Sequence, residues 1–183
     1  MNRWNDASIM EKNISRKRVF EGIILNIDHV MNELPNGRQA AREIAVHVGA
    51  SAVLPIDAQG NVYLVRQFRA PIDQVLLEIP AGKLDHVNED RLLAAKRELK
   101  EETGLDADNW LHLCDTFTTP GFSNEKISLY LARDLHAGQS RPDEDEFLNL
   151  VIMPFDEAFG MVMRGEIRDA KTQIAIAMAK NLI

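Results

Sequence analysis

The chain has 183 residues, of which 45% are hydrophobic and 27% are charged, so it can build a core of one domain; disordered and collagen-like chains are excluded. Its 28 acidic and 21 basic residues give a formal net charge of -7, which argues against nucleic acid or an anionic membrane as a partner. An anionic small substrate would also be repelled, unless a divalent cation or local arginines bridged it.

The first half of the chain is patterned mainly as β-strands. Its first fifteen or so residues are polar without clear periodicity, and we expect them to fray. One β-like stretch follows at residues 18–30, and the Asn36-Gly37 pair is a strong hairpin signal. Residues 57–61 predict a second turn. Further strands are predicted at residues 42–48, 51–56, 61–69 and 75–80.

A helix follows in the second half of the chain. Leu92, Ala95 and Leu99 recur at helical spacing, with Asn88 placed to cap the N-terminus and Gly104 the C-terminus. More strands are predicted at residues 111–118, 126–132 and 147–153, and two closing helices at 155–164 and 170–181. Many strands and few helices in mixed order predict a layered α/β or α+β domain.

The cysteine count and the lack of targeting signals bear on location. Cys114 is the sole cysteine, so an internal disulfide is impossible, which fits a reducing compartment. The N-terminus lacks the apolar core of a secretory signal. The longest uncharged stretch, residues 45–56, is shorter than the roughly 20 residues of a transmembrane helix. We therefore expect a cytoplasmic protein.

The predicted helix carries three glutamates near its C-terminal end. Glu98 and Glu102 lie one turn apart beside the apolar stripe, with Glu101 next to them. A hard divalent cation would relieve their mutual repulsion, because carboxylate oxygens are ligands that Mg²⁺ prefers. The alternative is a solvated, salt-bridged face, which the helix pattern alone favours. Its neutralising cations would be Lys96, Arg97 and Lys100.

The segment from Gly82 to Leu105 resembles the Nudix box, G-x5-E-x7-R-E-U-x-E-E-x-G-U, where U is aliphatic. The fixed positions from the first glutamate onward are all matched, by Glu89, Arg97, Glu98, Leu99, Glu101, Glu102, Gly104 and Leu105. One departure is that six residues, not five, separate Gly82 from Glu89, so strict counting puts Asn88 at the glutamate position. We interpret this as one residue inserted in the turn, and we expect Glu89 to keep the family role of pairing with Arg97.

The resemblance extends to the ADP-ribose pyrophosphatase branch of the family. Residues 76–85 resemble its lead-in to the box, and residues 119–125 resemble its Pro-Gly loop. Pro120 stands fifteen positions past Leu105, the spacing associated with ADP-ribose hydrolysis. The resemblance implies the Nudix α/β/α sandwich with a mixed sheet at residues 49–183. Residues 1–48 would form a small N-terminal β subdomain that is exchanged in a homodimer.

By the same resemblance, the reaction would be Mg²⁺-dependent hydrolysis of ADP-ribose to AMP and ribose 5-phosphate, with Mn²⁺ as a possible substitute. One alternative is the same chemistry on another nucleotide sugar such as GDP-mannose. Another is a non-catalytic ADP-ribose sensor on this scaffold, which would require eroded box glutamates or an added DNA-binding domain.

The resemblance also assigns roles to individual residues. Glu98 and Glu102, with the Ala81 carbonyl, would hold the metal. Glu101 would be a further ligand or would hydrogen-bond the ligands, and Arg97 would orient the glutamates. The general base would come from a later loop, with Glu144 as first choice and Glu146 as second. The alternative is that residues 143–146 are merely a solvated acidic loop.

Substrate contacts are expected from four more side chains besides Pro120. Arg69 and Arg42 match positions near the diphosphate or terminal ribose, and Arg42 would reach the partner's site. For either arginine, a surface salt bridge is the alternative. Glu78 and Glu125 would bind ribose hydroxyls or adenine, or would hydrogen-bond the loops.

Overall fold

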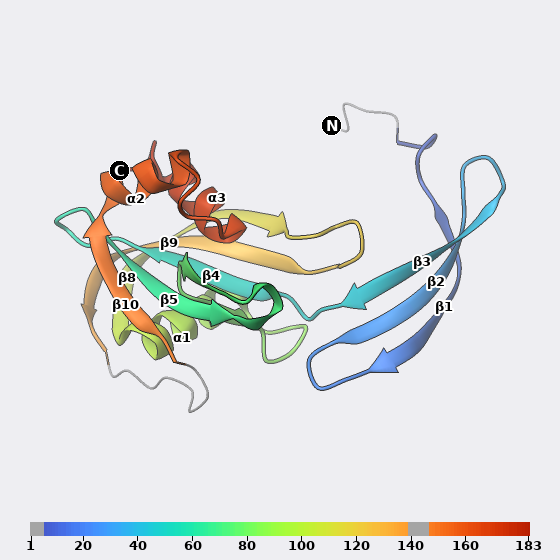
Figure 1. The fold of residues 1–183 in the computed structure, drawn as a ribbon, viewed down its shortest axis with the longest axis horizontal. Coiled ribbons are helices and arrows are strands. Elements are labelled where there is room, and N and C mark those ends of the chain that lie inside the picture. Colours follow the sequence, from blue (N-terminus) through green and yellow to red (C-terminus); the bar gives the residue numbers. More distant parts are fainter. Residues whose placement is uncertain (1–5, 139–146) are drawn as a thin grey trace. The chain divides into compact units, whose positions relative to one another are not determined.

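The computed structural model describes residues 6–138 and 147–183 (Figure 1). The chain divides into two compact units. The first unit comprises Met1–His47 and Thr119–Glu125, and the second comprises Val48–Thr118 and Lys126–Ile183. The first boundary falls one residue before the end of the subdomain that we expected, and the later segment Thr119–Glu125 also belongs to the first unit.

The first unit is built on a three-stranded antiparallel sheet. Its order is β1-β2-β3, and its strands are β1 (Lys12–Glu21), β2 (Asn26–Glu33) and β3 (Gln39–Val46). The predicted hairpin at Asn36-Gly37 is confirmed. The Leu34 N–H donates to the Arg38 carbonyl at 2.7 Å. Gly37 has φ 79°, a value that favours glycine.

The start of this sheet corrects two predictions. Residues 18–30 do not form one strand, because the Gly22 N–H donates to the Leu25 carbonyl at 2.9 Å and turns the chain. The expected fraying of the first fifteen residues is also wrong from Lys12 onward, where β1 begins. Every residue of β1 is exposed, so no alternation of buried and exposed side chains marks this strand. Its pairing with β2 holds it instead, and local sequence does not reveal that pairing.

The second unit contains two sheets. One has the order β7-β4-β9-β8, with β4 and β9 parallel and the other pairs antiparallel, so it is mixed. The other is antiparallel with the order β10-β5-β6. The strands are β4 (Ala50–Pro55), β5 (Asn61–Arg69), β6 (Gln74–Glu78), β7 (Ala81–Lys83), β8 (Leu105–Phe117), β9 (Lys126–Ala137) and β10 (Asn149–Pro154). A short 3-10 helix, Ala70–Ile72, joins β5 to β6.

Three α-helices complete the second unit: α1 (Arg91–Thr103), α2 (Phe155–Met163) and α3 (Ala170–Ala179). Figure 1 shows α1 on one side of the strands and α2 and α3 on the other. Strand β4 is buried along its whole length. Leu54 packs in the larger core that includes residues of α2 and α3, whereas the adjacent Val53 packs with Leu99 of α1. Because strand side chains alternate between faces, this arrangement is the expected α/β/α sandwich.

The two ends of α1 test the capping predictions. Gly104 is the C-terminal cap as predicted, with φ 71° and an N–H that donates to the Lys100 carbonyl at 3.0 Å. The N-cap is Asp90, and Asn88 is not, because the turn that precedes α1 extends two residues further than we predicted. The Asp90 carboxylate accepts from the N–H groups of Leu92 and Leu93 at 2.9 Å each. Among the described residues, the helices are too short and too polar for any to cross a bilayer.

Candidate active site

The site begins where strand β7 passes the middle of α1. The Glu98 side chain is buried, and its carboxylate lies directly against the backbone of Gly82. A Cβ at position 82 would overlap with that carboxylate. Glycine therefore allows this close approach, and a side chain at position 82 would displace the Glu98 carboxylate.

Arg97 is the hub of the glutamate cluster. Its Nη1 lies 2.6 Å from a Glu98 oxygen and 3.1 Å from a Glu101 oxygen. Its Nη2 lies 3.5 Å from Glu89 Oε1 and donates to the Lys83 carbonyl at 3.3 Å. The predicted pairing of Glu89 with Arg97 is thus confirmed, and Arg97 ties the loop before α1 to the helix itself.

The extra residue between Gly82 and Glu89 is absorbed by the turn before α1. The Glu89 N–H donates to the His86 carbonyl at 3.0 Å, which closes the turn around Asn88. Glu89 Oε2 then accepts from the Asp85 N–H at 2.6 Å. The insertion therefore changes the loop without displacing Glu89 from Arg97.

The charge on Arg97 is secured by its partners. Burial disfavours the charged form of this guanidinium. The charge and hydrogen bond of Glu98, together with the hydrogen bond to Glu101, outweigh that effect and raise the pKa of Arg97 above its ordinary value. Arg97 thus acts as a permanent cation between carboxylates that would otherwise repel one another.

The two lysines of the salt-bridged alternative make other contacts. Lys96 Nζ lies 5.6 Å from the centre of the Trp110 ring, over its face. Lys100 Nζ lies 3.1 Å from a carboxylate oxygen of Asp106. The salt-bridged alternative is therefore seen at Arg97, which pairs with Glu98 and Glu101, while Lys96 and Lys100 contact Trp110 and Asp106.

The donors for a metal ion are close in sequence and chemically suited to it. Glu98 and Glu102 lie one turn apart on α1, and one carboxylate oxygen of Glu102 is buried. Ala81 lies at the start of β7, beside the Gly82 backbone that Glu98 contacts. Within residues 6–138 and 147–183, no three His, Cys, Asp or Glu side chains are already arranged as a metal centre. The carboxylate and carbonyl donors fit a hard divalent cation, while Arg97 engages two of the carboxylates.

A second set of charges lies at the ends of β5 and β6. Glu78 is 1% exposed, and its two oxygens accept from Arg69 Nε at 2.7 Å and Nη2 at 2.6 Å. Lys171 also pairs with Glu78. Burial alone would raise the pKa of Glu78, but the hydrogen bonds and charges of Arg69 and Lys171 together hold it below its ordinary value. Glu78 is therefore a buried carboxylate between two cations.

Arg69 is also within electrostatic reach of the glutamates of α1. The hydrogen bonds to Glu78 raise the pKa of Arg69, burial opposes this, and the charges of Glu78, Asp169 and Glu102 add to the rise. The Arg69 side chain is 39% exposed, so part of its guanidinium can reach a ligand.

The remaining predicted contacts lie in the first unit. Arg42 of β3 pairs with Glu11 and donates to the Ala41 carbonyl at 3.0 Å. Glu125 lies 3.5 Å from His47 Nδ1. Pro120 is exposed, in a turn that the Ser123 N–H closes by donating to the Thr119 carbonyl at 2.9 Å. The two proposed bases, Glu144 and Glu146, lie outside the described residues.

Sequence reasoning assigned no role to the first turn of α3. Asp169 caps this helix, and its carboxylate accepts from the Thr172 N–H at 3.0 Å. Lys171 is 9% exposed and lies between Asp169 and Glu78. The string Asp-x-Lys-Thr at a helix start is a capping signal, but only the fold brings it to Glu78.

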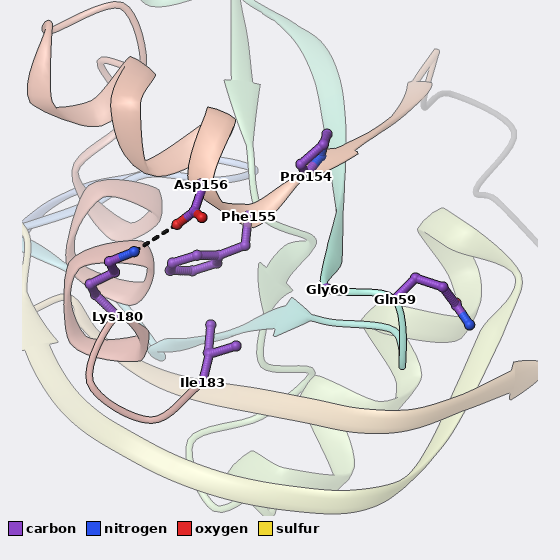
Figure 2. Close-up of a pocket in the computed structure, with 7 residues that line it drawn as sticks. All are labelled: Gln59, Gly60, Pro154, Phe155, Asp156, Lys180 and Ile183. Carbon is purple, nitrogen blue, oxygen red and sulfur yellow. Dashed lines mark hydrogen bonds and ion pairs between the residues drawn. The ribbon is translucent and has the colours of Figure 1, made fainter.

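A cavity of about 330 Å³ lies elsewhere in the second unit (Figure 2). It is formed between the turn that follows β4, the start of α2 and the C-terminal residues. Lys180 lies 2.6 Å from Asp156 and 5.7 Å from the centre of the Phe155 ring. The residues that line this cavity include none of those predicted for the site.

The chain is similar to known proteins over most of its length. The family model described as NUDIX domain matches residues 45–174. ADP-ribose pyrophosphatase of Bacillus subtilis (strain 168) is 38% identical over 171 residues, which are 92% of either chain. Methanol dehydrogenase activator of Bacillus methanolicus is 39% identical, over 91% of this chain and 90% of its own. GDP-mannose pyrophosphatase of Yersinia enterocolitica is 35% identical, over 72% and 73% respectively.

A solved structure described as an ADP compounds hydrolase has the same fold. Its TM-score is 0.82 at 22% identity, over 94% of this chain and 93% of that one. The expected α/β/α sandwich is thereby confirmed for the described part of the chain.

Proposed function

We propose that this chain, which belongs to the NUDIX family, hydrolyses the diphosphate of ADP-ribose to give AMP and ribose 5-phosphate. The observation that carries the proposal is the glutamate cluster around Arg97, in a chain that is 38% identical to an ADP-ribose pyrophosphatase over 92% of its length. The box glutamates are all present, which argues against a non-catalytic sensor.

Glu98, Glu101 and Glu102, with the Ala81 carbonyl, would hold Mg²⁺, and Mn²⁺ could replace it. A bound divalent cation would neutralise the charge of the phosphate oxygens and would lower the pKa of a water molecule bound to it. The residues of the chain itself would hold the carboxylate oxygens in position for the cation. Gly82 sets the position of the Glu98 carboxylate, and Arg97 orients Glu98 and Glu101.

Arg69 would bind the diphosphate. A guanidinium donates in a planar fork that matches phosphate oxygens, and it stays charged at all relevant pH values. Its partial exposure and the charge of nearby Glu102 support this role. Arg42, Pro120 and Glu125 would contact substrate from the first unit, and Arg42 would act in the site of a partner chain.

A homodimer is part of the proposal. Large apolar side chains are exposed on the first unit, which is unusual for a surface that faces only water. They include Ile14, Val19, Phe20, Ile23, Ile24 and Leu25. A second copy of the chain would cover them. Light scattering on the purified protein should give twice the chain mass, and a monomer at micromolar concentration would contradict this part.

The general base is assigned to Glu144, with Glu146 as second choice. A base on a loop after the box could reach the site when substrate is bound. Glu144→Gln and Glu146→Gln, compared side by side, would decide between them. Replacing the glutamate that acts as the base should remove most of the kcat of the enzyme. The other variant should have a kcat near that of wild type.

A second candidate substrate is GDP-mannose, which is favoured by the 35% identity to a GDP-mannose pyrophosphatase. The test is a panel of nucleotide sugars, compared by kcat/KM with Mg²⁺ and with Mn²⁺. We expect the highest value for ADP-ribose, with AMP as product. Binding of ADP-ribose without turnover in either metal would instead support a sensor.

We also propose a cytoplasmic location. The support is the single cysteine, which fits a reducing compartment.

A further inference from the structure

Four charged side chains outside the box form a continuous network in the second unit. Arg69 at the end of β5 bonds to both oxygens of Glu78 at the end of β6. Lys171 of α3 pairs with Glu78 from another direction and lies 3.1 Å from Asp169. The two cations and two anions balance, so the network is neutral as a whole.

The network also connects α3 to the chain that leads into the box. Thr172 Oγ1 donates to Asp169 at 2.5 Å and accepts from the Ile79 N–H at 2.8 Å. Ile79 lies two residues before Ala81, the first residue of β7. The first turn of α3 is therefore fixed against the strand end that precedes the proposed metal ligands.

Stability alone does not explain why these charges are buried. Glu78 and Lys171 are 1% and 9% exposed, so both have lost most of their hydration. A well-packed apolar set of similar volume is often as stable as a buried ion pair, because removing charges from water is costly. A role in placing a functional group accounts for the charges better.

Arg69 is the member of the network that can meet a ligand. Its Nε and Nη2 are bonded to Glu78, which fixes the plane of the guanidinium. Its Nη1 takes part in neither bond, and the side chain is 39% exposed. The charge of Glu102 adds to the rise in the pKa of Arg69, so this guanidinium is within electrostatic reach of one glutamate of α1.

We propose that Lys171 is a positioning residue for substrate binding: it fixes the carboxylate of Glu78, and Glu78 in turn holds Arg69 toward the diphosphate. The inference rests on the proposed function, which places the diphosphate at Arg69. It assigns Glu78 to the support of Arg69 and not to contact with ribose or adenine.

The test is a double-mutant cycle on ligand binding. Lys171→Met removes the cation and keeps most of the side chain's length. Calorimetry in buffer with EDTA measures the Kd for ADP-ribose without turnover. We expect Lys171→Met to weaken binding about tenfold, the equivalent of about 1.4 kcal/mol. In an Arg69→Gln background the same change should weaken binding less than about twofold, because Lys171 acts through Arg69.

Two further variants keep the test decisive. Lys180→Met, at the C-terminal cap of α3, removes a lysine that pairs with Asp156, and it should leave the Kd unchanged. If Lys171→Met does not fold, Asp169→Asn replaces it in the cycle. Asparagine caps helices well, so this variant keeps the cap and removes the second partner of Lys171.

The outcomes separate the two claims. Equal weakening in both backgrounds means that Lys171 acts independently of Arg69, and it overturns the inference. An unchanged Kd in the single variant overturns it as well. A wild-type protein that binds ADP-ribose and does not hydrolyse it with Mg²⁺ refutes the proposed function, and the cycle still decides the inference. A wild type that binds neither ADP-ribose nor GDP-mannose in EDTA, and hydrolyses neither with Mg²⁺, refutes both.

Discussion

The two units of the chain are stabilised in different ways. The second unit packs helices on both faces of β4 and β9 and has two clusters of buried apolar side chains, one with residues of α2 and α3 and one with Leu99 of α1. Among the described residues of the first unit, only Asp28 and Val30 are buried. Its sheet is held by strand pairing and by the ion pairs of Asp28 with Arg16 and Arg18. The comparison teaches that the glutamate helix belongs to the unit that has the apolar core, whereas the first unit leaves many of its large apolar side chains exposed.

The largest expected effect tests whether the second unit holds the chemistry. Glu102→Gln should lower kcat about a thousandfold, or about 4 kcal/mol of transition-state stabilisation. The melting temperature should hardly change, because the repulsion between Glu98 and Glu102 is relieved. AMP release and thermal unfolding measure the two effects. Glu157→Gln, on the exposed face of α2, is the control and should keep full activity. A near-normal kcat in Glu102→Gln would contradict the assignment of Glu102 as a metal ligand.

The second prediction compares the two cores directly. Leu129 is fully buried in β9, and Leu129→Ala should lower the free energy of unfolding by about 3 kcal/mol. Val30 lies in the sheet of the first unit, and Val30→Ala should cost only about 1 kcal/mol, because it removes less apolar surface and Val30 belongs to neither core cluster. Urea unfolding measures both. Equal losses would mean that the first unit is as well packed as the second.

The third prediction concerns the close approach of β7 to α1. Gly82→Ala should displace the Glu98 carboxylate and lower kcat/KM about tenfold, or about 1.4 kcal/mol. Gly160→Ala is the matched control. There the new Cβ would meet only the end of the flexible Arg164 side chain, so activity should be unchanged and α2 should be stabilised by up to about 1 kcal/mol. An unchanged kcat/KM in Gly82→Ala would show that activity does not depend on this position of the Glu98 carboxylate.

The smallest expected effect is a pH dependence of stability in the second unit. The folded state lowers the pKa of Glu78 below 4.5, so its contribution is fully present above that pH and is lost as the pH falls through the folded value. Without Lys171, the pKa of Glu78 is lowered less. The melting temperature of Lys171→Met should therefore fall less than that of wild type as the pH drops below 4.5. Calorimetric scans from pH 7 to 3.5 test this, with Lys180→Met as the control. Curves that fall in parallel would contradict it.

Local patterns predicted much of the second unit. The helical spacing of Leu92, Ala95 and Leu99 and the glycine at 104 located α1 to within a residue at its C-terminal end. A strand at residues 51–56 and a turn at residues 57–61 were also predicted from the sequence, and β4 covers Ala50–Pro55. The box spacing, together with Glu89 and Arg97, gave the pairing that the structure contains. Each of these features depends on residues within a few turns of one another.

Short-range periodicity and backbone preferences in the sequence therefore determined a layered α/β or α+β domain, the glutamate helix and its cap at Gly104, and the resemblance to the family narrowed the class to α/β. Only the tertiary structure decided the rest. It recruited the fully exposed β1 into a sheet, seated Glu98 against Gly82, and brought Lys171 to Glu78 across 93 residues of chain. The physical reason is that long-range contacts depend on which elements pack together, and polar residues of β1 and α3 carry no local sign of their distant partners.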